Sequence, residues 1–466
     1  ISTNVADVFG LQQENILFNN ELYFVIDNGS VGSEVFKTDG TLAGTKLLKD
    51  INPNFGSNPE NFTIFNGQLF FTADDGFNGN QLWKTDGTEV GTVLVSANPK
   101  FPTSLIVFNG NLYFQAQDNN FDSELWKSDG TGVGTVLLKD IDPAGSGFPK
   151  DFTVFNGELF FIATTTNEGT ELWKTNGTEV GTILVKDINP GVTNSGINNL
   201  QVNDNFFLFT ADDGNNGTEL WKTDGTVAGT ILLKDLSVGG NSTNFSGMLN
   251  FNATTTFIVA ETSDFGGEVW KTDGTTAGTV LVKDINPGAN SSIGQFSGVK
   301  PLVHNGVIYF DANDGVNGVE LWRSDATEAG TMMVKDINSN NSIENGKGIV
   351  EGVFLVNNKI IFEAFNADKN RELWITDGTE GGTNILKDLN PNKGWGVSLD
   401  ESVIINSLLL FNGSNGNNGF ELWKSDGTAN GTTLVKDIND GGSINQPKYL
   451  TKGIDNLYFV ADDGNS

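Results

Sequence analysis

The sequence predicts an all-β protein, a β-propeller of about nine four-stranded blades, with eight or ten blades as alternatives. A phrase of the form ELWKTDGTxxGT occurs nine times, and the steps between its Asp-Gly turns run from 43 residues (Asp86 to Asp129) to 52 (Asp273 to Asp325). β-Branched and aromatic residues dominate between turn residues, and no stretch has a helical period. Four short antiparallel strands in roughly 50 residues match one propeller blade.

Residues 152–188 show how one repeat unit is built. The first strand is expected at 152–155, and an Asn-Gly pair, the strongest short hairpin signal, leads to the second at 158–163. A polar loop precedes the third strand at 171–174, which carries the Trp. The Asp-Gly-Thr turn then leads to the fourth strand at 182–188. We call these strands a, b, c and d.

The second strand, b, is apolar at consecutive positions, as in Leu159, Phe160 and Phe161. Neighbouring residues of a strand point to opposite faces, so both faces of this strand must be buried between two other sheets. A ring of blades meets that need and limits exposed edges. An open β-superhelix of the same hairpins is the alternative. Residues 1–466 are expected to form a single repeat domain of nine units, with an extra a–b hairpin at one end.

The repeated phrase resembles the bacterial ELWxxDGT repeat family, and the resemblance covers about residues 15–463. The chain departs from the pattern at Phe36 for Trp, Asn176 for Asp and Ala326 for Gly. The family is associated with large secreted or surface proteins, so the resemblance implies a secreted, extracellular or cell-surface location. It supplies no catalytic residues.

Repetition favours structural roles for the residues of the phrase. One Trp per unit, worth roughly 4–6 kcal/mol when fully buried, is expected to pack between blades. The Asp of the turn is expected to accept backbone N–H groups, and Asn176 keeps that acceptor without the charge. The Lys-Asp pair that ends most d strands is expected to form hydrogen bonds between blades. The repeated Trp residues are Trp83, Trp126, Trp173, Trp221, Trp270, Trp322, Trp374 and Trp423.

The composition excludes several classes of function. A net charge of −31 would repel a phosphate backbone, so nucleic acid is rejected as a partner. The chain lacks cysteine, which excludes thiolate catalysis and Cys-zinc sites. No apolar run approaches the ~20 residues of a membrane span, so membrane insertion is not expected. His304 is the only histidine and flanks an Asn-Gly turn, which disfavours a Ser-His-Asp triad.

The b–c and d–a loops share one end of the blades and hold nearly all the variation in length and sequence. We expect function at this end, because binding usually resides on variable loops of a rigid scaffold. The loops are acidic, and oxygen ligands on Gly-rich loops suit Ca²⁺; ordinary solvated turns are the competing interpretation. The candidate metal ligands are Asp74, Asp75, Asp212, Asp213, Asp311, Asp314, Asp462 and Asp463.

Two places that break the repeat are further ligand-binding candidates. Glu261 and Asp264 lie in an atypical b–c loop, and Trp395 is the only Trp outside strand c, which suits sugar stacking. We therefore expect a non-enzymatic extracellular structural or binding protein that acts through its acidic loops, within a larger surface or fibrous assembly. Its expected partners are a glycan, a protein or further copies of itself. The alternative is a carbohydrate-active enzyme on a propeller scaffold.

Overall fold

The computed structural model describes residues 15–293, 301–339, 348–365, 370–391, 394–417, 419–438, 446–453 and 456–462. Contacts divide the chain into two compact units. Unit 1 comprises residues 1–202 and 207–232, and unit 2 comprises residues 203–206 and 233–466. Within the described part of the chain every regular element is a strand, and no helix there is long and apolar enough to span a membrane.

The first five blades are each one sheet whose four strands follow in chain order. Their strands are β1 (Asn15–Phe18), β2 (Glu21–Asp27), β3 (Ser33–Thr38), β4 (Lys46–Leu47), β5 (Glu60–Phe65), β6 (Gln68–Asp74), β7 (Asn80–Thr85), β8 (Val93–Leu94), β9 (Lys100–Phe108), β10 (Asn111–Gln117), β11 (Ser123–Ser128), β12 (Val136–Lys139), β13 (Lys150–Phe155), β14 (Glu158–Thr165), β15 (Gly169–Thr175), β16 (Ile183–Lys186), β17 (Asn198–Asn203), β18 (Phe206–Asp212), β19 (Thr218–Thr223) and β20 (Ile231–Lys234).

Four further blades and a C-terminal hairpin follow. Their strands are β21 (Asn244–Asn252), β22 (Thr255–Thr262), β23 (Gly266–Thr272), β24 (Val280–Lys283), β25 (Leu302–His304), β26 (Val307–Asn313), β27 (Val319–Ser324), β28 (Met332–Lys335), β29 (Ile349–Val356), β30 (Lys359–Phe365), β31 (Arg371–Thr376), β32 (Asn384–Lys387), β33 (Val397–Ile405), β34 (Leu408–Gly413), β35 (Glu421–Ser425), β36 (Thr433–Lys436), β37 (Lys448–Lys452) and β38 (Leu457–Val460).

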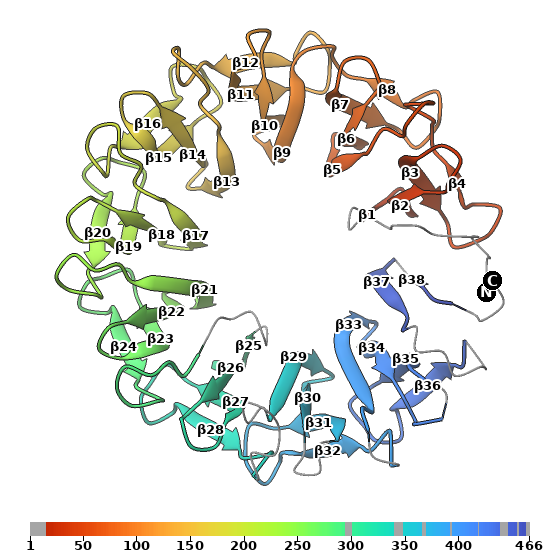
Figure 1. The fold of residues 1–466 in the computed structure, drawn as a ribbon, viewed down its shortest axis with the longest axis vertical. Coiled ribbons are helices and arrows are strands. Elements are labelled where there is room, and N and C mark those ends of the chain that lie inside the picture. The colour runs from red at the N-terminus through yellow and green to blue at the C-terminus, as the bar shows by residue number, and fades with distance from the viewer. Residues whose placement is uncertain are drawn as a thin grey trace. The chain divides into compact units, whose positions relative to one another are not determined.

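The all-β, four-stranded-blade architecture predicted from the sequence is confirmed: in the described residues nine sheets have four antiparallel strands, and the extra a–b hairpin is the C-terminal β37–β38 pair. Within each unit the blades stand side by side in chain order (Figure 1). The d strands are shorter than expected: β16 spans Ile183–Lys186 instead of 182–188, because the Glu171 side chain accepts the Ile188 N–H at 3.0 Å in place of a strand partner. Ring closure stays a prediction.

Aromatic side chains fill the space between successive blades of each unit. The eight strand-c Trp side chains are only 5–9% exposed, as predicted. Seven of them belong to core clusters that combine two successive blades of one unit: Trp126 of blade three joins Phe65 and Phe70 of blade two, and Trp322 of blade seven joins Val259 of blade six. Strand b is buried on both faces, as in the run Leu69 to Ala73. Within each unit, successive blades therefore share a core.

The Asp-Gly-Thr turn is held by its own side chains, which confirms the structural interpretation of the repeated phrase. In blade two, Asp86 Oδ1 accepts both the N–H and the hydroxyl of Thr88, at 2.9 and 2.7 Å. The hydroxyl of Thr88 accepts the Gly91 N–H at 2.9 Å. A Cβ on Gly91 would lie 2.0 Å from Asp86 Oδ1, so this position excludes larger residues. Asn176 makes the same bonds with its amide oxygen.

Lysine side chains link successive blades of a unit through the backbone of the following blade. Lys84 of strand c donates to the Gly130 carbonyl of the following turn at 2.9 Å, and Lys49 of strand d donates to the Thr92 carbonyl at 2.8 Å. Lys335 repeats the second bond at Thr383, also at 2.8 Å. The inter-blade role predicted for the lysines of the Lys-Asp pairs is confirmed for these residues.

Candidate functional site

Buried glutamates at the start of strand c hold the d–a connectors at the variable end. Glu124 accepts the Ile141 and Gly147 N–H groups, both at 2.7 Å, and Glu268 accepts the hydroxyl of Ser292 at 2.7 Å. Burial raises the pKa of Glu124 to about 7 and that of Glu320 to about 8. The repeated Glu of the phrase therefore fixes the loops on which any site must be built.

Blade two shows that this glutamate works together with the end of strand d. Gln81 stands in place of the Glu, and its Nε2 donates to the Ala97 carbonyl at 3.0 Å. In the same blade Ser96 and Ala97 replace the Lys-Asp pair. An amide supplies an N–H donor that a carboxylate lacks. Gln81 in place of Glu therefore suits the altered end of strand d in this blade.

The acidic b–c loops use their carboxylates to shape themselves. Asp74 Oδ1 accepts the Gly76 N–H at 2.7 Å, and Asp75 Oδ1 accepts two N–H groups at 2.9 Å each. Asp212 and Asp213 repeat this arrangement, with Gly214 N–H 2.7 Å from Asp212 Oδ1. These hydrogen bonds lower the pKa of Asp75 and of Asp213, although partial burial opposes the shift.

The third predicted loop needs a correction. Asp314 takes the position of Asp75 and accepts the Val316 and Asn317 N–H groups at 2.9 and 2.7 Å. The partner position belongs to Asn313, which accepts the Gly315 N–H at 2.8 Å. Asp311 lies two residues earlier in strand β26, paired with Leu321, because the Asn-Asp-Gly turn starts later than the acidic pattern indicates.

The C-terminal pair of candidate ligands is described only in part. Asp462 is half-buried after β38, and Asp463 lies outside the described residues. In the described residues, no group of three or more acidic or histidine side chains could hold a metal ion. The N–H groups that these carboxylates accept hold the shape of the loops, and calcium binding by them stays a prediction.

Trp395 lies apart from the other indoles, in the d–a connector that joins blades eight and nine of unit 2. It is 54% exposed, against 5–9% for the eight strand-c residues. A parallel bridge pairs it with Arg371, and the Gly396 N–H donates to the Arg371 carbonyl at 2.8 Å. A Cβ on Gly396 would lie 2.6 Å from the Glu372 carboxylate, so only glycine fits beside the indole.

A buried cation supports the inner face of this indole. The Arg371 guanidinium carbon lies 5.0 Å from the centre of a Trp395 ring, within the range of a cation–π contact. Arg371 forms an ion pair with the fully buried Glu363, whose other oxygen accepts the Leu399 N–H at 2.8 Å. Burial lowers the pKa of Arg371 to about 10, so the guanidinium stays charged at neutral pH.

A second carboxylate lies at the edge of this cluster. Asp400 Oδ1 is 4.0 Å from Arg371 Nη2, and the Asp400 side chain is half exposed. The Ser398 hydroxyl donates to Asp400 Oδ2 at 3.1 Å, and burial raises the pKa of Asp400. The sequence indicated Trp395 but not Arg371, Glu363 or Asp400; an arginine before the Glu-Leu-Trp of blade eight was the available signal.

The other predicted ligand-binding residues lie on a different blade. Glu261 is exposed on β22 and accepts the Asn244 side-chain amide at 3.0 Å. Asp264 is exposed in the following turn, 3.4 Å from the Ser263 hydroxyl. Both belong to blade six, whereas Trp395 lies between β32 and β33, so the structure does not combine them into one site. His304 ends β25 beside Asn305, as expected for a turn-flanking residue.

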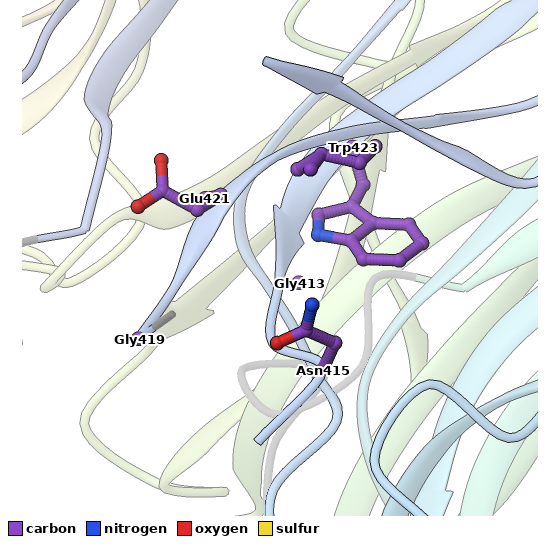
Figure 2. A pocket seen from close by; sticks show the side chains of 6 residues that line it. Gly413, Asn415, Gly419, Glu421 and Trp423 are labelled. Atoms are coloured by element: carbon purple, nitrogen blue, oxygen red, sulfur yellow. The ribbon is translucent and has the colours of Figure 1, made fainter. Parts of the chain in front are cut away.

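A small hollow beside Trp423 in blade nine has a structural cause. It is lined by Gly413 of β34, Asn415 and Gly419 of the b–c loop, and Glu421 of β35 (Figure 2). Gly413 stands where blade two has Ala73, and a Cβ on it would lie 2.7 Å from Trp423 Cδ1. The Trp423 indole therefore lies where an alanine methyl group at position 413 would be, and the Glu421 side chain points away from the indole.

No protein-family model and no curated protein matches the chain. Among solved structures, a puromycin hydrolase is 12% identical, with 72% of this chain and 54% of that one covered and a TM-score of 0.33. A puromycin-hydrolyzing peptidase of Mycobacterium tuberculosis is 10% identical, with coverages of 80% and 52% and a TM-score of 0.33. A prolyl endopeptidase structure is 11% identical, with coverages of 71% and 49% and a TM-score of 0.34. This chain spans about half the length of those proteins.

The comparisons do not bear out the expected function, a non-enzymatic extracellular structural or binding protein: the three solved structures are a hydrolase and peptidases. None of these three is named as a carbohydrate-active enzyme, which was the alternative. The similarity is too low to transfer an activity to this chain.

Proposed function

We propose that the chain recognises carbohydrate at the connector between blades eight and nine, with Trp395 as the stacking surface. The observation that carries the proposal is the contrast in burial: eight indoles are packed between sheets, and the ninth is 54% exposed. Exposing a large aromatic ring forfeits the free energy of burying it, and a rigid, half-exposed indole suits ligand contact.

The chemistry of the exposed ring favours a sugar. The face of an indole carries negative charge density, and the C–H groups along one face of a pyranose ring are weakly positive. Arg371 covers one side of Trp395 at 5.0 Å, which leaves the ligand the other side. Asp400, half exposed beside Arg371, supplies carboxylate oxygens as acceptors for sugar hydroxyl groups.

The site is rigid before any ligand arrives. The backbone of Trp395 is bridged to Arg371, and the Arg371 side chain is ion-paired with buried Glu363. Fixing the ring in advance lowers the entropy cost of binding. Arg371 and Glu363 are therefore positioning residues for the indole, and Trp395 and Asp400 are the groups expected to touch the ligand.

Trp395→Ala tests the proposal directly. We expect it to abolish signals on a glycan array and to weaken calorimetric binding of the best glycan at least about tenfold. Trp395→Phe should keep part of the affinity, because a smaller aromatic face remains. Phe77→Ala, which removes an exposed ring from unit 1, is the matched control and should bind like the original chain. Equal array signals from the original chain and Trp395→Ala would refute the proposal.

Secretion, self-association and membership of the ELWxxDGT repeat family stay predictions.

A further inference from the structure

Phenylalanine side chains gather in the exposed loops at the variable end of unit 1. Five of them are between 44% and 86% exposed; four lie in b–c loops or d–a connectors, and Phe101 is the second residue of β9. The c–d turns at the opposite end of the blades contain no phenylalanine. The exposed residues, which we call the Phe face, are Phe55, Phe77, Phe101, Phe121 and Phe148.

The loops that carry these rings lie against one another. A Cβ on Gly79, two residues after Phe77, would lie 2.7 Å from Phe101 Cζ, so the Phe101 ring rests on the b–c loop of blade two. The Phe148 N–H donates to the Ser123 carbonyl at 3.0 Å, two residues after Phe121. Blades two and three therefore each place one Phe from the b–c loop near one in or just after the next connector.

Three rings of the Phe face lie on strained backbone. The φ angles are 51° at Phe101, 69° at Phe121 and 45° at Phe148, in the left-handed region that bulky residues rarely adopt. Such a conformation costs on the order of 1–3 kcal/mol per residue and persists only where the surrounding structure enforces it. The fold therefore holds these apolar rings outward at a cost in free energy, instead of placing glycine or asparagine there.

Carboxylates surround the same rings. Asp118 shapes the loop of Phe121 by accepting the Asn120 and Asp122 N–H groups at 2.7 and 3.1 Å. Burial raises the pKa of Asp140, and the charges of Asp118, Asp122 and Asp142 raise it further, which places four carboxylates near one another. The loops of blades two and three, together with Asp74 at the end of β6, hold six aspartates, against three lysines at the adjoining strand ends, Lys100, Lys139 and Lys150.

We propose that the Phe face docks a cationic protein segment in which Lys or Arg alternates with apolar side chains. Exposed apolar rings rimmed by charge mark interaction sites. Apolar side chains of the segment would bury Phe77, Phe121 and Phe148, and its cations would face the aspartates. Charge complementarity of this kind sets the choice of partner and speeds association.

A second copy of the chain is the less favourable occupant. Each copy carries a net charge of −31, and the Phe face is itself acidic, so pairing two such faces would bring like charges together. Nucleic acid is repelled by the same charge. The cationic segment is thus the partner that satisfies both the apolar and the electrostatic character of the surface.

Fluorescence anisotropy with a labelled peptide tests the docking surface. The probe alternates lysine and leucine between glycine–serine spacers, and two control probes carry glutamate for lysine or serine for leucine. We expect the triple variant Phe77→Ser, Phe121→Ser, Phe148→Ser to weaken binding of the lysine–leucine probe at least about tenfold. The matched control is Val90→Ser, Val133→Ser, Val180→Ser, which removes equally exposed apolar residues from the c–d turns and should leave binding unchanged.

Several outcomes would overturn the proposal. Equal binding of the glutamate and lysine probes would remove the electrostatic argument, and equal binding by the two triple variants would show nonspecific adhesion. Sedimentation velocity decides the second-copy alternative: dimers that dissociate in the Phe triple variant would assign the Phe face to self-association. Far-ultraviolet circular dichroism of both variants separates loss of binding from loss of fold. The glycan site in unit 2 shares none of these residues, so the two tests fail independently.

Discussion

The two ends of the blades differ in how their side chains are used. At the c–d end, Asp86 and Thr88 form a closed set of hydrogen bonds, and nearly the same set recurs in every blade. At the b–c and d–a end, a buried Glu such as Glu124 fixes the connector, but the side chains that point outward differ from blade to blade. Exposed aromatic residues such as Phe77 and Trp395 lie at this second end.

The two ends therefore separate the residues that stabilise the fold from the residues that are available for binding. At the c–d end, polar side chains bind within their own turn or to the backbone of the following blade, so few substitutions are compatible with these contacts. The loop end is anchored at one carboxylate, which leaves the remaining loop positions free to vary. Substitutions at the two ends should therefore produce different effects, stability at one end and binding at the other.

The largest expected difference is between two tryptophans. Trp221 is 5% exposed and stacks on Phe209 with ring centroids 6.4 Å apart. Trp221→Ala should lower the free energy of unfolding by about 3–5 kcal/mol, because it leaves a cavity between blades. Trp395→Ala should change it by less than about 0.5 kcal/mol. Denaturant titration monitored by circular dichroism measures both, and similar losses would break the distinction between core and site indoles.

The buried glutamates at the loop end should make stability depend on pH. Burial raises the pKa of Glu320 from its ordinary value of 4.5 to about 8 and that of Glu171 to about 7. Because the folded state favours the protonated form of these glutamates, their contribution to stability is fully present below pH 4.5. This contribution is lost as pH rises through 7 to 8. We expect a higher melting temperature at pH 5 than at pH 8.

Glu320→Gln sharpens this prediction, because glutamine cannot ionise and blade two already carries Gln81 at the same position. The variant should show a smaller drop in melting temperature between pH 5 and pH 8 than the original chain. At the c–d end the pH dependence of stability has the opposite sign. Hydrogen bonds from Thr41 lower the pKa of Asp39, so the stability that Asp39 contributes is lost as pH falls below 3.8. An unchanged slope in Glu320→Gln would show that other groups cause the pH dependence.

Two adjacent glycines of one turn give a smaller, well-matched contrast. A Cβ on Gly382 would lie 2.0 Å from Asp377 Oδ1, whereas a Cβ on Gly381 meets nothing within 4 Å. Gly382→Ala should cost about 1–3 kcal/mol by displacing the carboxylate, and Gly381→Ala should be neutral or stabilise by up to about 1 kcal/mol. Equal melting temperatures for the two variants would contradict the account of the turn.

The smallest expected effect is that of a chelator. Asp75 and Asp213 already accept two backbone N–H groups each, so their loops need no cation. We expect the melting temperature to stay the same with and without EDTA. A decrease of several degrees, reversed by added Ca²⁺, would contradict this prediction and support the calcium hypothesis.

Local patterns made most of the fold predictable. The Asn-Gly hairpin at Asn156 and the alternation around Trp173 placed all four strands of blade four within a few residues. Strand d was predicted too long, because the Glu171 side chain takes the Ile188 N–H that strand pairing would otherwise use. Asp311 was misplaced because the sequence shows an acidic cluster, whereas the position of the turn decides which residue caps it.

The candidate site was predictable only in its exposed part. Trp395 stood out because it departs from the repeat. Its support by Arg371 and Glu363 joins strands b and c of blade eight to a connector more than twenty residues away, and no local pattern encodes such a contact. Long-range pairing of single residues requires the folded arrangement.

The lysine contacts between blades have a consequence for how such a chain can change over time. Lys84 and Lys335 reach carbonyl oxygens, which every residue type possesses, so the accepting blade needs no particular side chain there. At these contacts one copy of the unit is therefore as suitable as another. Duplication or deletion of a whole unit would leave these hydrogen bonds intact, whereas the side chains that pack between blades would still have to fit.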